Sequence, residues 1–408
     1  MPSITLYFRV HQPFLLRRYS SSEIDLSHCY FNEEGSSESL SFRADGSYLP
    51  ANHLLLSLIK KFEGKFKVNF SISGTTLELM KKYAPNVLRT FRRLVHTGCV
   101  EILGEPYYNS LSSLYSREEF VNQVKKHQRL VKELLGVQTK IFRNTELIHN
   151  NKIGGWACEM GFGGILCEGL ERILQGRSIN LQYSIPGNSS CQLLLRNASL
   201  SDDIAFRFGN EDWNEFPLTA EKFAEWIHRH ADLDCNINLF MDYETIGIHK
   251  PKETGIFEFL KYLPEKILDN EAWTFANPSE IISHQKSNGD YNVTTTISWA
   301  DKPIESCVWC QNMMQNNTLK KIYSLEGLVH ECGNDECLTT WGRLQAADYF
   351  YYMSNTGRLS YQYSNPFQSA EEAHSCYTNI LTDFEIMLIR KGLDKFKRRP
   401  YLLSAAIL

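Results

Sequence analysis

Two acidic side chains stand where predicted strands end, and together they suit one kind of chemistry. Glu146 comes shortly after the run Lys140–Arg143, and Asp242 follows the run Asn236–Met241. Two carboxyl groups that flank a glycosidic bond can cleave it, because one attacks or activates water while the other protonates the leaving oxygen. The sequence gives no separation between the two groups, so retaining and inverting chemistry both stay open at this point.

The elements that would position these groups alternate between short strands and longer helices. Two capping boxes, Thr75-x-x-Glu78 and Ser116-x-x-Glu119, each open an amphipathic run. The alternation predicts parallel strands covered by helices, as in an α/β barrel or a doubly wound sheet. No G-x-G-x-x-G motif follows the first strand, which disfavours dinucleotide binding. The predicted strands are Ile4–Val10, Lys67–Ile72, Cys99–Leu103, Lys140–Arg143, Gly164–Cys167, Gln192–Leu195, Asn236–Met241 and Trp273–Ala276.

Side chains alternate between the two faces of a strand, and the active sites of barrels lie at the carboxyl ends of the strands. Applied to four of the strands, this alternation gives one inward-facing set for each. Every set contains a polar group near its end, so we predict a site at this rim of the barrel. The predicted inward sets are Thr5, Tyr7, Arg9 and His11; Glu101; Phe142, Asn144 and Glu146; and Asn236, Asn238, Phe240 and Asp242.

The composition limits the class of protein. The 408 residues are 43% hydrophobic, enough for a sizeable core, and Lys plus Arg number 43 against 47 for Asp plus Glu. The resulting net charge of −4 gives no electrostatic footprint for nucleic acid or an anionic membrane, so we expect neither partner. The sequence contains no run of eighteen apolar residues and no secretion signal, which predicts a cytoplasmic protein. No feature of the sequence predicts an oligomeric state.

From about Thr294 onward, helical patterns dominate, over Glu326–Val329, Leu338–Met353 and Ala370–Leu393. We therefore expect a catalytic barrel over residues 1–285 and a helical domain over residues 286–408 that completes the cleft.

The eleven cysteines are scattered along the chain, which favours reduced thiols over a disulfide scaffold. One group could hold a structural zinc: Cys307 and Cys310, followed by Cys332 and Cys337. The second pair misses the close spacing of zinc ribbons, and the first pair also fits two small apolar residues one helical turn apart. We predict no metal site, with zinc as the open alternative.

Several segments carry a resemblance to a known enzyme family. They are His11–Pro13, Ser71–Gly74, Gly98–Glu101, Phe142–Ile148, Leu200–Phe208, Leu239–Thr245, Ile297–Asp301 and Leu344–Met353. In this order they resemble glycoside hydrolase family 57, the α-amylase and 4-α-glucanotransferase family, and above all its shorter bacterial α-amylase-like members. The resemblance covers nearly the whole chain and implies an incomplete (β/α)7 barrel followed by a C-terminal helical domain.

The resemblance also implies a reaction: retaining hydrolysis of α-1,4-linked glucans without a metal or another cofactor. Glu146 matches the family's nucleophile and Asp242 its general acid/base. The positions expected to contact substrate are His11, Glu101, Trp299, His249 and Asp348, the last of them from the helical domain.

The chain departs from the family pattern close to these positions. The departures are Asn109 in place of a histidine, His149 in place of a tyrosine, Ile248 and Lys250 in place of polar residues, and Tyr349 where relatives tend to carry a histidine. Because both carboxylates are kept, we expect the departures to alter substrate choice and rate more than reaction class.

The sequence bears on three alternative functions. A 4-α-glucanotransferase would use the same two carboxylates and pass the glycosyl group to a sugar instead of water. A weakly active or non-catalytic α-glucan-binding homologue would keep the scaffold and lose turnover. A metal-dependent carbohydrate deacetylase is disfavoured, because the sequence lacks the required motif of a paired Asp followed by His-x3-His.

Overall fold

The computed structural model describes residues 1–230, 235–299, 308–355 and 365–397. The chain forms two compact units that interleave along the sequence. The first comprises Met1–Gln12, Ser37–Tyr107 and Glu118–Ile304, and the second Pro13–Ser36, Tyr108–Arg117 and Glu305–Leu408. The functional division into a catalytic barrel over residues 1–285 and a cleft-completing domain over residues 286–408 stays a prediction.

The first unit is built around a barrel-like sheet of parallel strands in the order β5-β4-β1-β10-β9-β7-β6. Gly104, just after β5, bridges to Phe142 of β6 in parallel and so brings the two ends of the sheet together. The strands are β1 (Ser3–Val10), β4 (Val68–Ile72), β5 (Val100–Ile102), β6 (Ile141–Arg143), β7 (Gly164–Glu168), β9 (Asn188–Arg196) and β10 (Asn236–Asp242). This is the incomplete (β/α)7 barrel that the family resemblance implied, and it decides between the barrel and the doubly wound sheet that the strand–helix alternation left open.

Two further strands extend this sheet. β11 (Thr274–Phe275), which the sequence also predicted, pairs in parallel with the start of β1. β8 (Gln182–Ile185) pairs antiparallel with β9 and was missed in the sequence. Its four residues do alternate polar and apolar side chains, so the sequence carried a short strand signal there, and the hairpin with β9 completes the pair.

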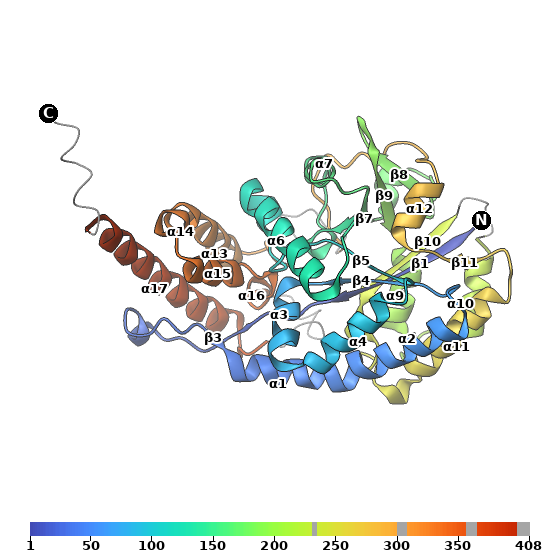
Figure 1. Ribbon diagram of the computed structural model, residues 1–408, viewed down its shortest axis with the longest axis horizontal. Helices are drawn as coiled ribbons and strands as arrows, with labels where there is room; N and C mark the ends of the chain where they lie inside the picture. Colours follow the sequence, from blue (N-terminus) through green and yellow to red (C-terminus); the bar gives the residue numbers. More distant parts are fainter. Residues whose placement is uncertain (231–234, 300–307, 356–364, 398–408) are drawn as a thin grey trace. The chain divides into compact units, whose positions relative to one another are not determined.

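Helices cover the outside of this sheet. In Figure 1, α2 and α4 lie on one side of β1, β4 and β5, and α6 and α7 lie on the other. The helices of this unit are α2 (Leu49–Lys61), α3 (Gly74–Tyr83), α4 (Pro85–Val95), α6 (Arg117–Leu135), α7 (Asn151–Glu159), α8 (Glu171–Leu174), α9 (Ala198–Asp202), α10 (Ala220–His228), α11 (Ile256–Leu268) and α12 (Pro278–His284), with α1 (Glu33–Arg43) crossing between the two units.

Local sequence signals explain how two of these helices begin. α6 begins directly after Ser116, where the second capping box predicted it. The first box was assigned to the wrong residue: α3 begins at Gly74, and the Ser73 side chain, not that of Thr75, accepts the N–H of Thr76. Thr75 instead donates its hydroxyl to the Gln12 carbonyl at 2.9 Å, because the loop after β1 lies against this end of α3.

The barrel interior is a cluster of apolar side chains from β1, β6, β7, β9 and β10 and from positions just after β5, β6 and β11, with α12 beside them. Tyr7 of β1 and Phe240 of β10 meet edge to face there, with ring centroids 5.3 Å apart. The inward sets predicted for β1 and β10 are therefore confirmed. The cluster comprises Tyr7, Leu103, Ile141, Leu147, Leu166, Leu194, Phe240, Ala276 and Ile281, with Ile282 and Trp299 packed against it.

The inward set predicted for β6 is wrong. Ile141 belongs to the interior cluster, whereas Phe142 packs against Phe120 of α6 and Phe162 on the helix side. A strand of three residues that is apolar on both faces carries too little alternation to fix its register from sequence. Glu146 reaches the site through the turn that follows β6.

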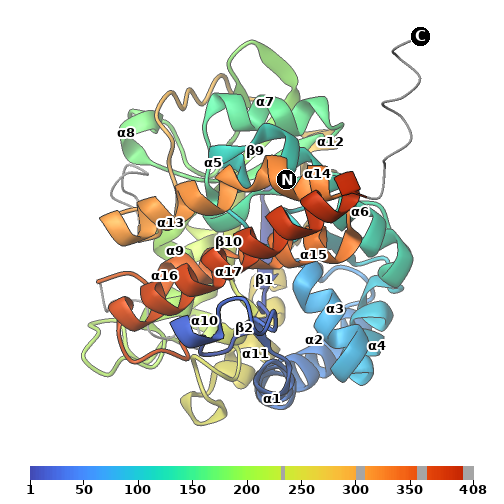
Figure 2. The same ribbon diagram turned by 90° about the vertical axis from the view of Figure 1, so that its left-hand side faces the viewer.

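The second unit is mainly helical. Its longest helix, α17 (Ala370–Lys397), packs along α13 (Met313–Ser324) and α14 (Glu326–Cys332), as Figure 2 shows. The expected run Leu338–Met353 is broken into α15 (Asp335–Leu344) and α16 (Ala347–Tyr351), because Ala346 pairs with Ser110 and the Ala347 N–H donates to the Asn109 carbonyl. The unit also holds the short α5 (Ser112–Tyr115) and the antiparallel pair β2 (Leu15–Leu16) and β3 (Phe31–Asn32).

Within the described residues, no helix is both long and apolar enough to cross a membrane.

Candidate active site

One guanidinium holds both predicted catalytic carboxylates. Arg9 lies near the end of β1, and its two terminal nitrogens contact Glu146 Oε1 at 3.1 Å and Asp242 Oδ1 at 3.0 Å. The pairing register of β1 and β10 places Arg9 directly opposite Asp242, which explains half of this arrangement. Because the side chains of Arg9 and Glu146 are almost fully buried, their charges interact with little solvent screening.

Glu146 reaches Arg9 through a tight turn and not through strand alternation. It lies in the 3-10 turn Thr145–Leu147, with φ 54° at Glu146 and φ 52° at Leu147. Left-handed backbone at a residue other than glycine costs on the order of 1–3 kcal/mol and is often found at functional sites. The Asn144 side chain supports the turn, since its Oδ1 accepts the Thr145 N–H and its Nδ2 donates to the Ile148 carbonyl.

Trp299 supplies a second donor to Glu146. The indole Nε1–H donates to Glu146 Oε2 at 2.6 Å, and the Trp299 backbone N–H donates to the Glu146 carbonyl at 3.3 Å. The indole also stacks on Phe206, with ring centroids 6.4 Å apart, and 46% of Phe206 is exposed. Each carboxylate oxygen of Glu146 therefore has a cationic or N–H donor that fixes its position.

Further buried polar contacts lie next to this group. Arg143 of β6 contacts Glu105 at 3.4 Å, and both side chains are buried. Tyr7, one inward position before Arg9 on β1, shares a 2.6 Å hydrogen bond with Ser71, and burial raises the pKa of its hydroxyl to about 12. Tyr7 is therefore protonated at neutral pH, and its hydroxyl serves as a neutral hydrogen-bonding group beside Arg9.

His11 lies two residues beyond Arg9 and is held in place by the start of α3. Its Nδ1 lies 2.7 Å from the Ser73 hydroxyl, the same side chain that caps α3. The structure thus brings Glu146, Asp242 and Trp299 together around Arg9 and anchors His11 at the end of the same strand. A sugar contact by His11 or by Trp299 stays a prediction.

The Glu101 carboxylate is hydrogen-bonded to the start of α12. Its Oε2 accepts the Ser279 N–H at 3.0 Å, in the first turn of α12. Burial raises the pKa of this carboxyl above its usual value, and the Ser279 hydrogen bond opposes the rise. The contact is of the kind that stabilises a helix N-terminus, and the predicted sugar contact of Glu101 stays a prediction.

The turn that follows Asp242 contains His249 and two of the departures. The His249 N–H donates to the Glu244 carbonyl at 2.8 Å, so its backbone belongs to this turn, and its substrate contact stays a prediction. Lys250 Nζ donates to the Phe206 carbonyl at 2.8 Å, and burial lowers the pKa of this amine. Ile248 packs against Gly46, where a Cβ would lie 2.5 Å from its Cδ1. Both departures therefore have packing or bonding roles in this unit.

Glu244, next in sequence to the predicted acid/base, has a structural environment. It is buried and accepts hydrogen bonds from the Tyr48 hydroxyl and from Gln12 Nε2.

The departure at His149 places a buried imidazole beside the site. His149 follows Glu146 closely in the chain, and burial lowers its pKa to about 4. Its backbone pairs with Ile297 in an antiparallel bridge, and Trp299 follows two residues later. The segments that carry Glu146 and Trp299 are thus joined by backbone hydrogen bonds through His149.

Three more of these residues lie in the second unit: Asp348, which is predicted to contact substrate, and the departures Tyr349 and Asn109. Asp348 is fully buried on α16, and its predicted contact with sugar stays a prediction. The Tyr349 hydroxyl donates to the Phe14 carbonyl, so this departure has a bonding role in its own unit. Asn109 is also fully buried, and its carbonyl holds the start of α16.

The described residues contain no group of three or more His, Cys, Asp or Glu side chains placed to hold a metal ion. Cys332 and Cys337 lie with their sulfurs 3.6 Å apart. Cys307, one of the four cysteines that could hold a structural zinc, lies outside the described residues.

Two groups near the site were missed as site residues in the sequence. Arg9 stood in the predicted inward set of β1, yet a lone arginine gave no sign that it would contact two carboxylates. Its position opposite Asp242 would have revealed it, had the pairing of β1 with β10 been known. Glu105 follows a glycine just after β5, outside the strand pattern, and carried no sequence signal.

A family model described as "Glycosyl hydrolase family 57" matches residues 5–297, which contain the whole cluster around Arg9 except Trp299. The chain belongs to glycosyl hydrolase family 57. A relative described as "Putative alpha-amylase" from Methanocaldococcus jannaschii is 39% identical over 415 residues, which cover 97% of this chain and 88% of the relative. This family 57 chain therefore matches a relative of comparable length nearly from end to end.

Solved structures share the fold of this family 57 chain at low sequence identity. The 4-α-glucanotransferase of Thermococcus litoralis matches with a TM-score of 0.67 and 16% identity over 86% of this chain, which spans only 56% of that protein. The family 57-type branching enzyme of Pyrococcus horikoshii matches with a TM-score of 0.65 and 12% identity, over 96% of this chain and 88% of that protein. These likenesses confirm the predicted fold.

Proposed function

We propose that this chain is a retaining glycoside hydrolase that acts on α-1,4-linked glucans, with Glu146 as nucleophile and Asp242 as general acid/base. The observation that carries the proposal is the single Arg9 guanidinium that contacts both carboxylates in a family 57 barrel. One guanidinium can bridge only carboxyl groups that lie close together. Such proximity favours the retaining arrangement, in which the two groups are about 5–5.5 Å apart, over the inverting one.

The environments of the two carboxylates support different roles. The Glu146 side chain is 2% exposed and receives Arg9 on one oxygen and the Trp299 indole on the other, so it is held in one orientation, as suits a nucleophile. The Asp242 side chain is 14% exposed, so it can exchange a proton with substrate and water. The positively charged Arg9 between them keeps both carboxylates in place before each turnover.

The proposed reaction runs in two steps. Glu146 attacks the anomeric carbon while Asp242 gives its proton to the leaving glycosidic oxygen, and a glycosyl-enzyme ester forms. Asp242, now ionised, takes a proton from water, the water oxygen attacks the same carbon, and Glu146 leaves as a carboxylate. No metal or redox cofactor takes part in either step. A cytoplasmic place of action is also proposed, and the ten described cysteines, all free, suit a reducing compartment.

Two isosteric variants test the assignment. Glu146→Gln removes the nucleophile, so we expect kcat on maltooligosaccharides to fall more than about a thousandfold. Asp242→Asn removes the acid/base, so an activated aryl glycoside should be turned over again when azide is added, giving a glycosyl azide of retained configuration. Thermal unfolding of each variant serves as the control for folding. Wild-type activity in Glu146→Gln would overturn the proposal.

Product analysis separates hydrolysis from transfer. Hydrolysis of maltohexaose gives only shorter products, whereas transfer also gives longer ones. Longer products would replace the proposed hydrolase with a 4-α-glucanotransferase. Binding of maltohexaose without any product would identify a non-catalytic α-glucan-binding homologue.

A further inference from the structure

A polar cavity that is open to solvent lies on the first unit, between α6 and the segment that leads into β6. Its volume is about 600 Å³, within the range of small-molecule sites. Three cations line it, Lys125, Arg129 and Lys132, and so do three amide side chains, Asn122, Gln128 and Gln138. The remaining lining residue is a threonine. None of these residues belongs to the site around Arg9.

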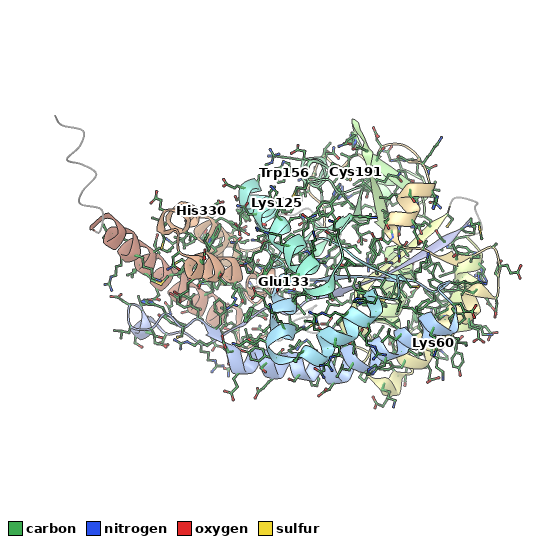
Figure 3. All side chains as sticks on the ribbon, viewed as in Figure 1. Lys60, Lys125, Glu133, Trp156, Cys191 and His330 are labelled. Carbon is green, nitrogen blue, oxygen red and sulfur yellow. The ribbon has the colours of Figure 1, made fainter. Side chains whose placement is uncertain are left out.

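The three cations form an unneutralised cluster on one face of α6. Lys125, Arg129 and Lys132 follow one another at intervals of four and three residues, so adjacent members face each other and repel. No ion pair joins any of them to a carboxylate among the described residues. Glu133, the acidic neighbour on α6, is bonded to Lys81 at 3.0 Å instead. Figure 3 shows both Lys125 and Glu133 on this helix. An anion seated among the three cations would remove their mutual repulsion.

The amides indicate what else such an anion carries. Each of Asn122, Gln128 and Gln138 has a carbonyl acceptor and an NH₂ donor, the pair of functions that a sugar hydroxyl requires. None of the described residues that line the cavity is aromatic, so they offer no stacking surface for a nucleobase or for the apolar face of a glucan. The cavity thus matches a compact molecule with a phosphate at one end and hydroxyls at the other.

We propose that this cavity binds a phosphorylated sugar, with the phosphate among Lys125, Arg129 and Lys132 and the hydroxyls on the three amides. A phosphate monoester carries a charge of about −1.5 to −2 at pH 7 and three acceptor oxygens, which complements three cations. The proposal goes beyond the glycosidase function and does not depend on it, because none of the lining residues has a role in catalysis.

Calorimetric titration of the full chain with glucose 6-phosphate tests the proposal. We expect saturable binding that weakens as salt is raised, and no binding of glucose at the same concentrations. Lys125→Gln and Arg129→Gln should each weaken binding about tenfold, the low end for a charge-assisted hydrogen bond, and the double variant should weaken it about a hundredfold. Lys60→Gln is the matched control, since Lys60 is an exposed lysine on α2 and should leave binding unchanged (Figure 3).

Inorganic phosphate and ADP, titrated separately, identify the ligand class. We expect inorganic phosphate to bind at least about tenfold more weakly than glucose 6-phosphate, because it lacks hydroxyls for the amides. Equal binding of inorganic phosphate, or tighter binding of ADP, would overturn the sugar assignment. Absence of saturable glucose 6-phosphate binding, or unchanged binding in the double variant, would overturn the site itself. Loss of glycosidase activity in Glu146→Gln tests the other function and leaves these binding results unaffected.

Discussion

Acidification should destabilise this protein through His149, because its imidazole is fully buried and its pKa is lowered from 6.5 to about 4. Between these two pH values the unfolded chain binds a proton that the folded chain does not. The contribution of the neutral imidazole to the free energy of unfolding is therefore fully present above about pH 6.5 and is lost as pH falls toward 4. The difference between the two pKa values corresponds to about 3 kcal/mol in total, of which about 2 kcal/mol is lost between pH 7 and pH 5.

The perturbation that isolates this contribution is His149→Leu, which removes the titrating group and keeps an apolar side chain of similar size. Urea unfolding at pH 7 and pH 5, followed by tryptophan fluorescence, gives the free energy of unfolding of both proteins. We expect the loss between the two pH values to be about 2 kcal/mol smaller in the variant than in the wild type. His127, whose pKa burial also lowers, is present in both proteins and cancels in the comparison.

The matched control is His96→Gln, at an exposed histidine that follows α4, and it should leave the pH dependence of unfolding unchanged. If the wild type and His149→Leu lost the same free energy between pH 7 and pH 5, burial of His149 would not be a cause of the acid sensitivity.

Three further predictions concern the site and the turn beside it. Arg9→Lys keeps the charge but replaces the guanidinium fork with one ammonium, so kcat on maltooligosaccharides should fall at least about tenfold, and an unchanged kcat would exclude a role for the fork. Trp299→Phe removes the indole donor from Glu146, so kcat should fall about a hundredfold while the melting temperature changes little. A lower melting temperature with an unchanged kcat would indicate that Trp299 has only a packing role. Gly247→Ala places a Cβ 2.0 Å from the Gly46 carbonyl oxygen at a φ of 100°, so the melting temperature should drop by several degrees, whereas Gly255→Ala, at a positive φ with no atom within 4 Å of the added Cβ, should cost less.

The sequence predicted much of the barrel because its strands carry clear physical signals. β1 and β10 alternate apolar and polar side chains over seven or more residues, and their inward faces could be assigned from parity alone. The resemblance to family 57 then placed Glu146, which parity could not do, since the residue reaches the site through left-handed backbone in the turn Thr145–Leu147. A glutamate in that conformation has no local sequence signature.

Other parts depended on contacts that no local pattern encodes. The ion pairs of Arg9 need the register of β1 with β10, which are separated by more than two hundred residues. The interleaving of the two units needs the segments Pro13–Ser36 and Tyr108–Arg117 to join helices far along the chain. The break between α15 and α16 likewise follows from pairing with Ser110. Tertiary hydrogen bonds outweighed local helix propensity at that point.

The position of β1 between β4 and β10 has a consequence for synthesis of the chain. β4 ends at residue 72, but the strand that covers the other edge of β1 is complete only at residue 242. The 170 residues between these two points (242 − 72) take roughly 9 to 34 s to synthesise at about 5–20 residues per second, and that edge of β1 has no partner during this time. During this interval Arg9 lacks both of its carboxylate partners or has only Glu146. A nascent chain that stops before Asn236 therefore presents an open, apolar strand edge, the kind of surface that chaperones protect and that otherwise aggregates.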